Sequence, residues 1–185
     1  MPDSKYALRL ATPADASAIA ALIALSARGL SVHDYTAPQV EGALQGAFGV
    51  DTQLIHDGTY FVAEDSARLL GCGGWSRRRT LFGGDARPDR DAAELDPRVD
   101  AAKIRAFFVH PDFPRRGIGT AILERCERDA AARGFTRFEL MSTLPGVRLY
   151  AARGYVAGEP IQWILPGGLA IEFVPMTRQA ASAPV

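Results

Sequence analysis

The sequence predicts an α/β fold, a sandwich built on one mixed sheet, in a single domain that spans residues 1–185. Two observations predict it. Short apolar runs typical of strands alternate with helical patterns along the whole chain, instead of separating into halves. The chain of 185 residues shows no internal repeat, linker or low-complexity segment, and a single domain commonly takes roughly 100–200 residues.

Composition and charge exclude several classes of protein. Hydrophobic residues make up 48% of the chain and charged residues 23%, which argues against a disordered or fibrous protein. The 21 lysines and arginines balance the 21 aspartates and glutamates, so no nucleic-acid or other polyanionic partner is expected. Cys72 and Cys126 cannot form a disulfide framework. They fit a reducing compartment, and we expect a cytoplasmic protein.

The elements are justified in chain order, beginning with a strand at Tyr6–Leu10. The apolar run at 16–27 is too short to span a membrane, which takes about 20 residues. Thr12 and Asp15 have the spacing of a capping box, and this favours a helix over a secretion signal. That helix presents one apolar face, formed by Ile19, Leu22 and Ile23. No membrane contact is expected.

The middle of the chain predicts a helix, two paired strands and a long polar segment. The helix covers Ala37–Ala47, and the strands are Thr59–Glu64 and Leu69–Thr80. Gly83–Asp100 contains five aspartates, one glutamate and three arginines. An irregular segment of this length is either functional or disordered. It is interpreted either as a loop that attracts a cationic amine or as a solvated loop.

Two further polar groups are weak candidates for a site. Arg77, Arg78 and Arg79 either contact an anionic substrate or form a solvated strand end. The three histidines, at positions 33, 56 and 110, are too scattered to indicate a metal site.

The second half of the chain carries the clearest patterns. Apolar residues recur every four positions through one long helix, which a glycine then ends. The predicted elements are a strand at Lys103–Val109, a helix at Gly117–Arg133, a strand at Phe135–Met141, a short helix at Pro145–Arg153, and a hairpin of Tyr155–Leu165 with Ala170–Thr177.

The segment Val109–Thr120 has the properties of an anion site. It runs from a strand through a loop of proline, arginine and glycine into the long helix. Glycines allow close backbone approach, and the first helical turn offers unpaired N–H groups. A Walker loop is excluded because no lysine is present, and a dinucleotide fingerprint because its third glycine is replaced by Ile122. Alternatively, Gly117 and Gly119 only form a turn and a close helix–sheet contact.

Two motifs in this order resemble the GNAT N-acetyltransferase superfamily. Pro114-Arg-Arg-Gly-Ile-Gly119 is similar to its cofactor loop, Gln/Arg-x-x-Gly-x-Gly/Ala. Leu149-Tyr-Ala-Ala-Arg-Gly-Tyr155 is similar to its later Leu-Tyr-x-x-x-Gly-Phe/Tyr. The resemblance is specific over residues 103–155. Pro114 departs from the usual Gln or Arg, and Thr143 stands where many members carry an asparagine.

The resemblance implies a fold and a cosubstrate. The sheet is expected to be mostly antiparallel, with helices on both faces and a splay between two central parallel strands. Acetyl-CoA is expected as acyl donor, without a metal. Residues matching the family's cofactor site would border the pantetheine arm (Phe107, Phe108, Val109), bind the pyrophosphate (Arg115, Arg116, Gly117, Ile118, Gly119, Thr120) or contact the cofactor elsewhere (Thr143). Because neighbouring strand residues point to opposite faces, Phe107 or Phe108 also belongs to the core.

The resemblance also implies transfer of the acetyl group to an amine of a small molecule, peptide or protein. Tyr150 matches the family's acid, which protonates the leaving thiolate. Glu139 is the nearest match to the base of some members, although its spacing to Thr143 is one residue short; His110, expected on the surface, and ordered water are alternatives. A non-catalytic CoA-binding sensor or interaction module remains the competing function, and a homodimer is left open.

Overall fold

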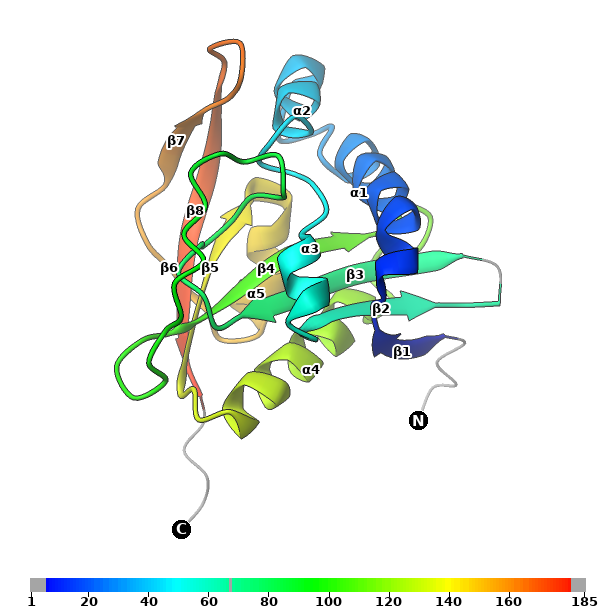
Figure 1. Ribbon diagram of the computed structural model, residues 1–185. Coiled ribbons are helices and arrows are strands. Elements are labelled where there is room, and N and C mark those ends of the chain that lie inside the picture. Colours follow the sequence, from blue (N-terminus) through cyan, green and yellow to red (C-terminus); the bar gives the residue numbers. More distant parts are fainter. Residues whose placement is uncertain (1–5, 67, 181–185) are drawn as a thin grey trace.

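The computed structural model describes residues 6–66 and 68–180 and contains one sheet of eight strands, in the order β1-β2-β3-β4-β5-β8-β6 with β7 paired to β8 (Figure 1). β4 and β5 are parallel, and every other neighbouring pair is antiparallel. The predicted mixed, mostly antiparallel sheet is therefore confirmed. The strands are β1 Ala7–Leu10, β2 Tyr60–Glu64, β3 Leu69–Ser76, β4 Ala102–Val109, β5 Arg137–Thr143, β6 Val156–Ala157, β7 Ile161–Ile164 and β8 Ala170–Gln179.

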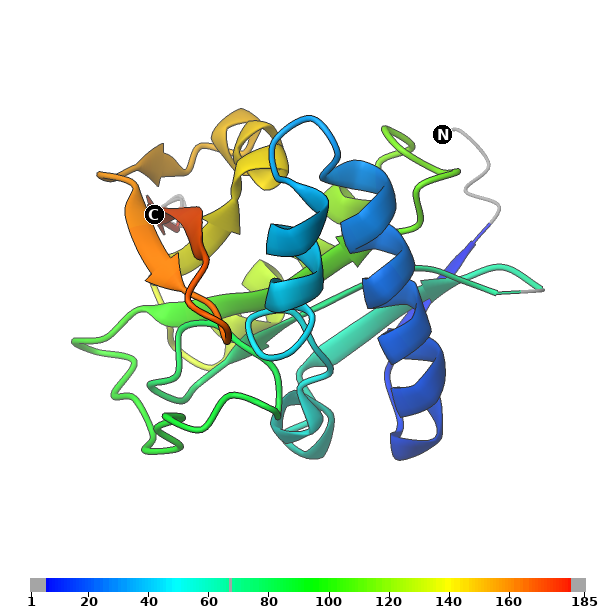
Figure 2. The same ribbon diagram turned by 90° about the horizontal axis from the view of Figure 1, so that it is seen from above.

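Helices cover both faces of this sheet. Figures 1 and 2 show α4 on the opposite side of the sheet from α1 and α2. α1, α2 and α3 contribute to one hydrophobic cluster, and α4 and α5 contribute to the other. The helices are α1 Ala16–Leu30, α2 Ala37–Ala43, α3 Thr52–His56, α4 Ile118–Ala132 and α5 Val147–Ala152, with single 3-10 turns at Pro13–Asp15 and Leu144–Gly146.

The start of the first helix follows the predicted capping box. The backbone N–H of Thr12 donates to Asp15 Oδ2 at 2.7 Å, and the Asp15 N–H donates to the Thr12 carbonyl at 2.9 Å. A 3-10 turn precedes α1, and the predicted apolar face of α1 is buried at Ile19, Leu22 and Ile23. The apolar run at 16–27 is thus a packed helix.

Four elements differ clearly from the sequence prediction. β3 ends at Ser76 instead of Thr80. α2 ends at Ala43 instead of Ala47. α3 was not predicted, because five residues are too few to display a helical period; Asp51 caps it, accepting from the Leu54 N–H at 3.4 Å. The strand expected at Tyr155–Leu165 is interrupted into β6 and β7, and the Gly158 N–H between them donates to the Pro175 carbonyl.

Glycines in β3 allow close packing of α4. A Cβ atom at Gly71 would lie 2.6 Å from Ile118 Cγ2, and one at Gly73 would lie 2.7 Å from Phe107 Cδ2. The β3–β4 register shifts between Cys72 and Gly74, which marks a β-bulge at these glycines. Opposite it, Ala106 adopts a φ of 57°, a conformation uncommon for a residue with a side chain.

The two parallel strands separate after three residue pairs. Ala102, Lys103 and Ile104 pair with Phe138, Glu139 and Leu140. Beyond Ile104, β4 continues to Val109 without a strand partner on its β5 side among the described residues. This is the predicted splay, and it leaves backbone polar groups available for a ligand.

Candidate functional site

A cavity of about 600 Å³ opens at the splay between β4 and β5. It extends from the loop that precedes α4 to the loop that precedes α3. All ten sequence-predicted cofactor residues line it, together with Tyr150. Those ten residues are Phe107, Phe108, Val109, Arg115, Arg116, Gly117, Ile118, Gly119, Thr120 and Thr143.

The glycine loop brings the N-terminus of α4 to one end of the cavity. Gly117 is the N-cap of α4 with a φ of 77°, which only glycine adopts without strain, and no atom lies within 4 Å of the position its Cβ would take. Gly119 has a different role, since its Cβ would lie 3.1 Å from Leu149 Cδ2. The N–H groups of the first turn find no backbone acceptor among the described residues, so they are available to an anion.

Three exposed arginines surround this end of the cavity: Arg115, Arg116 and Arg148. Arg116 stacks over the Phe113 ring at 5.0 Å, which restricts the orientation of its guanidinium group. Pro114, which replaces the Gln or Arg of the family pattern, also lines the cavity but has no N–H to donate. Positive charge at this end therefore comes from the two arginines that follow it and from Arg148.

The two phenylalanines of β4 point to opposite faces of the sheet, as predicted. The Phe107 ring meets Tyr150 edge-to-face, with centroids 6.1 Å apart, on the α4 side. The Phe108 ring meets Phe48 with centroids 5.7 Å apart, on the α1 side. Both also line the cavity, so each serves the core and the site.

Tyr150 combines burial with an unpaired hydroxyl. Its side chain, on α5, leaves the residue 7% exposed, and it lines the cavity. No described residue hydrogen-bonds to the hydroxyl, whereas the neighbouring Tyr155 donates to Glu127 Oε1 at 2.8 Å. Burial raises the pKa of the Tyr150 phenol, so it stays protonated at neutral pH. The hydroxyl is a proton donor that the protein itself does not use.

The residues considered as bases lie outside the cavity lining. Glu139 shares a face of β5 with Met141 and Thr143, but it forms an ion pair with Lys103. His110 was expected on the surface, and that expectation is wrong: it is buried, and its Nδ1 accepts from the Asp112 N–H at 3.2 Å. Neither side chain is among the residues that line the cavity.

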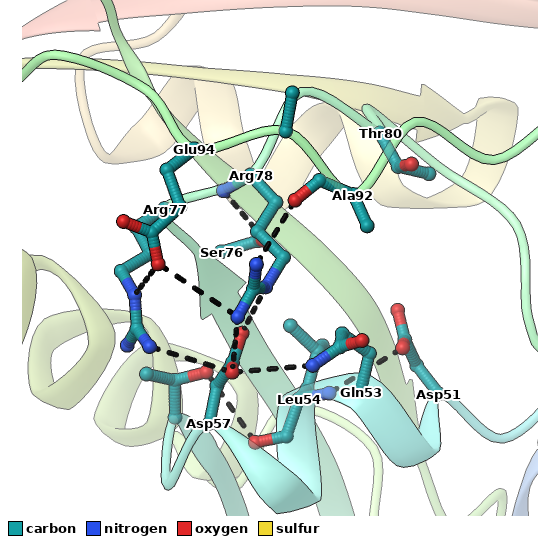
Figure 3. Close-up of polar contacts among 12 residues, drawn as sticks. Asp51, Gln53, Leu54, Asp57, Ser76, Arg77, Arg78, Thr80, Ala92 and Glu94 are labelled. Carbon is teal, nitrogen blue, oxygen red and sulfur yellow. Dashed lines mark hydrogen bonds and ion pairs between the residues drawn. The ribbon is translucent and has the colours of Figure 1, made fainter.

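The arginine run at the end of β3 is engaged in ion pairs (Figure 3). Arg78 donates to both oxygens of Asp57, at 2.7 and 2.9 Å, and Arg77 contacts Asp57 and Glu94. These contacts bind β3, the turn after α3 and the 83–100 segment together. The arginines are thus structural, and neither lines the cavity.

Four of the six acidic residues of the 83–100 segment form ion pairs, whereas Asp91 and Asp100 accept hydrogen bonds from backbone N–H groups. The partners in these ion pairs are mostly arginines of the same segment: Asp85 with Arg90, Asp89 with Arg87, and Asp96 with Arg98. Only Gly83 of this segment lines the cavity. Ion pairs between its own side chains hold the segment in place, and the carboxylates of these pairs contact arginines.

Sequence reasoning missed the far end of the cavity. Phe48, Phe82 and Phe173 form an aromatic wall there, with Phe82 and Phe173 centroids 5.5 Å apart. Arg105 lies beside it, 4% exposed, paired with the fully buried Asp51. These residues come from loops and strands far apart in the chain, so no local pattern marks them.

Within residues 6–66 and 68–180, no helix has the length and apolar character needed to cross a membrane. The same described residues contain no cluster of three or more histidine, cysteine or acidic side chains placed to hold a metal ion.

Comparison with known proteins gives a consistent family. The solved structures similar to this one include a GCN5-related N-acetyltransferase from Rhodopseudomonas palustris, with 24% identity, 97% of this chain and 98% of that chain covered, and a TM-score of 0.71. They also include yncA of Salmonella typhimurium with its cofactor acetyl-CoA, with 15% identity, 98% of each chain and a TM-score of 0.59.

A third similar structure is a Drosophila melanogaster polyamine N-acetyltransferase that forms N-acetylagmatine, with 11% identity, 94% of this chain and 99% of that chain covered, and a TM-score of 0.58. No curated protein matches the sequence. The family model described as the acetyltransferase (GNAT) family matches residues 30–155, more than half of the chain. The chain belongs to the GNAT acetyltransferase family.

Proposed function

We propose that the protein is an N-acetyltransferase that moves the acetyl group of acetyl-CoA to a primary amine by direct attack on the thioester. One observation carries the proposal. A single cavity joins an anion-binding helix terminus at Gly117 to the unpaired hydroxyl of Tyr150 through the open edge of β4. The similar yncA structure holds acetyl-CoA, which supports the same ligand here.

The residues present fit acetyl-CoA. Its pyrophosphate would meet the free N–H groups at the start of α4, between Gly117 and Thr120, with Arg115 and Arg116 adding charge. Its pantetheine amides would pair with the edge of β4 at Phe107–Val109, which has no strand partner on the β5 side; the Val109 N–H itself donates to Ser26 Oγ at 3.2 Å. Thr143, at the end of β5, adds a hydroxyl on the opposite wall.

Acetyl-CoA supplies the activated acetyl group. The amine nitrogen forms a bond to the carbonyl carbon, the carbon–sulfur bond breaks, the amine loses a proton, and the sulfur gains one. An alkyl ammonium with a pKa near 10 must lose its proton before it can attack. We propose that Tyr150 gives its proton to the departing sulfur, because its phenol is neutral, unpaired and directed to the cavity.

Removal of the amine proton is assigned to water. The described residues that line the cavity include no aspartate, glutamate or histidine. We propose that water passes the amine proton to the Glu139 carboxylate. Glu139 lies two residues from Met141, which lines the cavity, on the same face of β5. His110 is a weaker candidate because its Nδ1 already accepts a backbone hydrogen bond.

Binding and chemistry are tested separately. Acetyl-CoA at millimolar concentration should raise the melting temperature, because a ligand of the native state stabilises it by mass action. No rise would reject the assignment of the cofactor. Thiol release with a panel of primary amines then separates an enzyme from the competing non-catalytic CoA-binding module, which would show the thermal shift alone.

The proposed role of the glycine loop before α4 in binding acetyl-CoA can be tested with a variant and a matched control. Gly117→Glu places a carboxylate in the open space at the helix terminus and should abolish the thermal shift. Gly167→Glu imposes the same positive-φ strain, at a φ of 91°, and the same charge in the turn between β7 and β8. It should retain the shift. Loss of the shift in both variants, or in neither, would contradict the proposed loop.

A further inference from the structure

The end of the cavity away from the glycine loop is walled by aromatic and apolar side chains. Phe48, Phe82, Phe108 and Phe173 make ring contacts with one another, at centroid distances of 5.5 to 6.2 Å. Met141 and Leu81 extend this wall. A ligand enclosed here would bury apolar surface, which favours an acceptor with an apolar body.

The described lining of the same cavity contains no carboxylate that could pair with a cation. Its described lining includes four arginines and no acidic side chain. Arg105 is the charged residue at the aromatic end, and its Asp51 partner is fully buried behind the lining. Arg90 also pairs with Asp51 at 2.6 Å, so this carboxylate is already paired with two guanidinium groups. A second ammonium group entering this end would lie near the Arg105 guanidinium and would find no carboxylate in the lining to pair with.

The neighbouring acidic segment does not supply the missing counterion. Of residues 83–100, only Gly83 reaches the cavity. Asp85 accepts from Arg90 Nη1 at 2.7 Å, and Glu94 contacts Arg77 at 3.2 Å. Opening these pairs to bind a ligand would leave their arginines unpaired, which opposes such a rearrangement.

We propose that the acetyl acceptor is a monoamine with an aromatic or branched apolar body, and that polyamines are excluded. The inference rests on the proposed function and names the substrate class of its site. It sets this chain apart from the structurally similar Drosophila polyamine acetyltransferase: the two share a fold, and the charges of the acceptor pocket determine which amines bind.

The test compares amines under saturating acetyl-CoA with the full chain. Phenethylamine and isoamylamine represent apolar monoamines, and agmatine and spermidine represent amines with a second cationic group. Thiol release should give a kcat/KM for an apolar monoamine at least about tenfold above that for either polycation. The inference is overturned if a polycation is used equally well, or if no apolar monoamine raises thiol release above the rate without amine.

Variants of Phe82 make the test specific to the wall. Phe82 is only half-buried, so its replacement spares most of the core. Phe82→Glu should lower kcat/KM for phenethylamine about tenfold and raise it for spermidine, whereas Phe82→Leu should retain the preference for the monoamine. An unchanged preference in Phe82→Glu would overturn the inference.

The outcomes distinguish this inference from the proposed function. An intact thermal shift with acetyl-CoA in each Phe82 variant shows that the cofactor site persists. Acetylation of polycations with that shift present rejects the acceptor class alone. Absence of the shift in the unmodified protein rejects the proposed function itself.

Discussion

The acid role that we propose for Tyr150 rests on the surroundings of its side chain. Its ring packs between Phe107 and Tyr155, at centroid distances of 6.1 and 5.7 Å, so the orientation of the phenol is fixed by the core. A tyrosine that only filled the core would be expected to pair its hydroxyl, as Tyr35 does with the Glu172 carbonyl at 2.6 Å. The Tyr150 hydroxyl has no such partner among the described residues, and Tyr150 lines the cavity.

Tyr150→Phe should lower kcat by about 10²–10⁴-fold, the usual range for a lost general acid. The ring contacts remain, so the melting temperature and its rise with acetyl-CoA should change little. Turnover measured by thiol release and affinity measured by titration separate the two effects. Full activity in Tyr150→Phe would exclude the acid role.

At the scale of elements, the glycines of β3 set the distance between the sheet and α4. Gly71→Ala forces a Cβ to within 2.6 Å of Ile118 Cγ2, on a helix whose first turn borders the cavity. Overpacking of this kind costs about 1–3 kcal/mol. Urea unfolding should show that loss for Gly71→Ala.

Gly46→Ala is the control for that substitution. Gly46 has ordinary backbone angles and no atom within 4 Å of its would-be Cβ, so alanine should be neutral or slightly stabilising there. Equal stability of Gly71→Ala and Gly46→Ala would show that α4 is free to move away from β3 at no cost.

The sequence predicts those elements best whose signal is long and local. α4 displays four turns of apolar period. The bounds of α4 and β4 lie within one residue of the prediction, and those of β5 within two. α3 was not predicted because a helix of five residues is too short to show a helical period in the sequence. The cofactor end of the cavity follows from one continuous segment, whereas the aromatic wall combines Phe48, Phe82 and Phe173 from three distant segments, which no local pattern reveals.

At the scale of the whole molecule, many of the charges that sum to zero form arginine–carboxylate pairs, and these pairs hold distant segments together. Asp57, after α3, accepts from Arg78 at the end of β3, and Glu94 of the 83–100 segment joins the same group (Figure 3). The arginines around the glycine loop, Arg115, Arg116 and Arg148, form no ion pair with a described residue. Neutrality of the chain thus coexists with an unneutralised anion site, and the pairs give stability a defined dependence on pH.

Asp57 makes that dependence testable. Its carboxylate is 6% exposed, and the hydrogen bonds from Arg78 lower its pKa in the folded state below its unfolded value near 3.9. The ionised form therefore stabilises the fold fully above about pH 4, and this stabilisation is lost as pH falls through the lower folded value. Asp57→Asn should cost about 1–3 kcal/mol near neutral pH, since a charged acceptor is removed from the two partly buried N–H donors of Arg78.

The cost of Asp57→Asn should shrink as the pH falls, because acid neutralises the same carboxylate in the unmodified protein. Urea midpoints of both proteins, measured at neutral pH and at about pH 3, would show the two curves converging. Asp89→Asn is the control: its pair with Arg87 leaves the Asp89 side chain 58% exposed, and solvent screening makes such a pair nearly neutral to stability. An equal loss of unfolding free energy in Asp57→Asn at both pH values would contradict this prediction. The stability would then come from the packing of the turn after α3 and not from the ion pair.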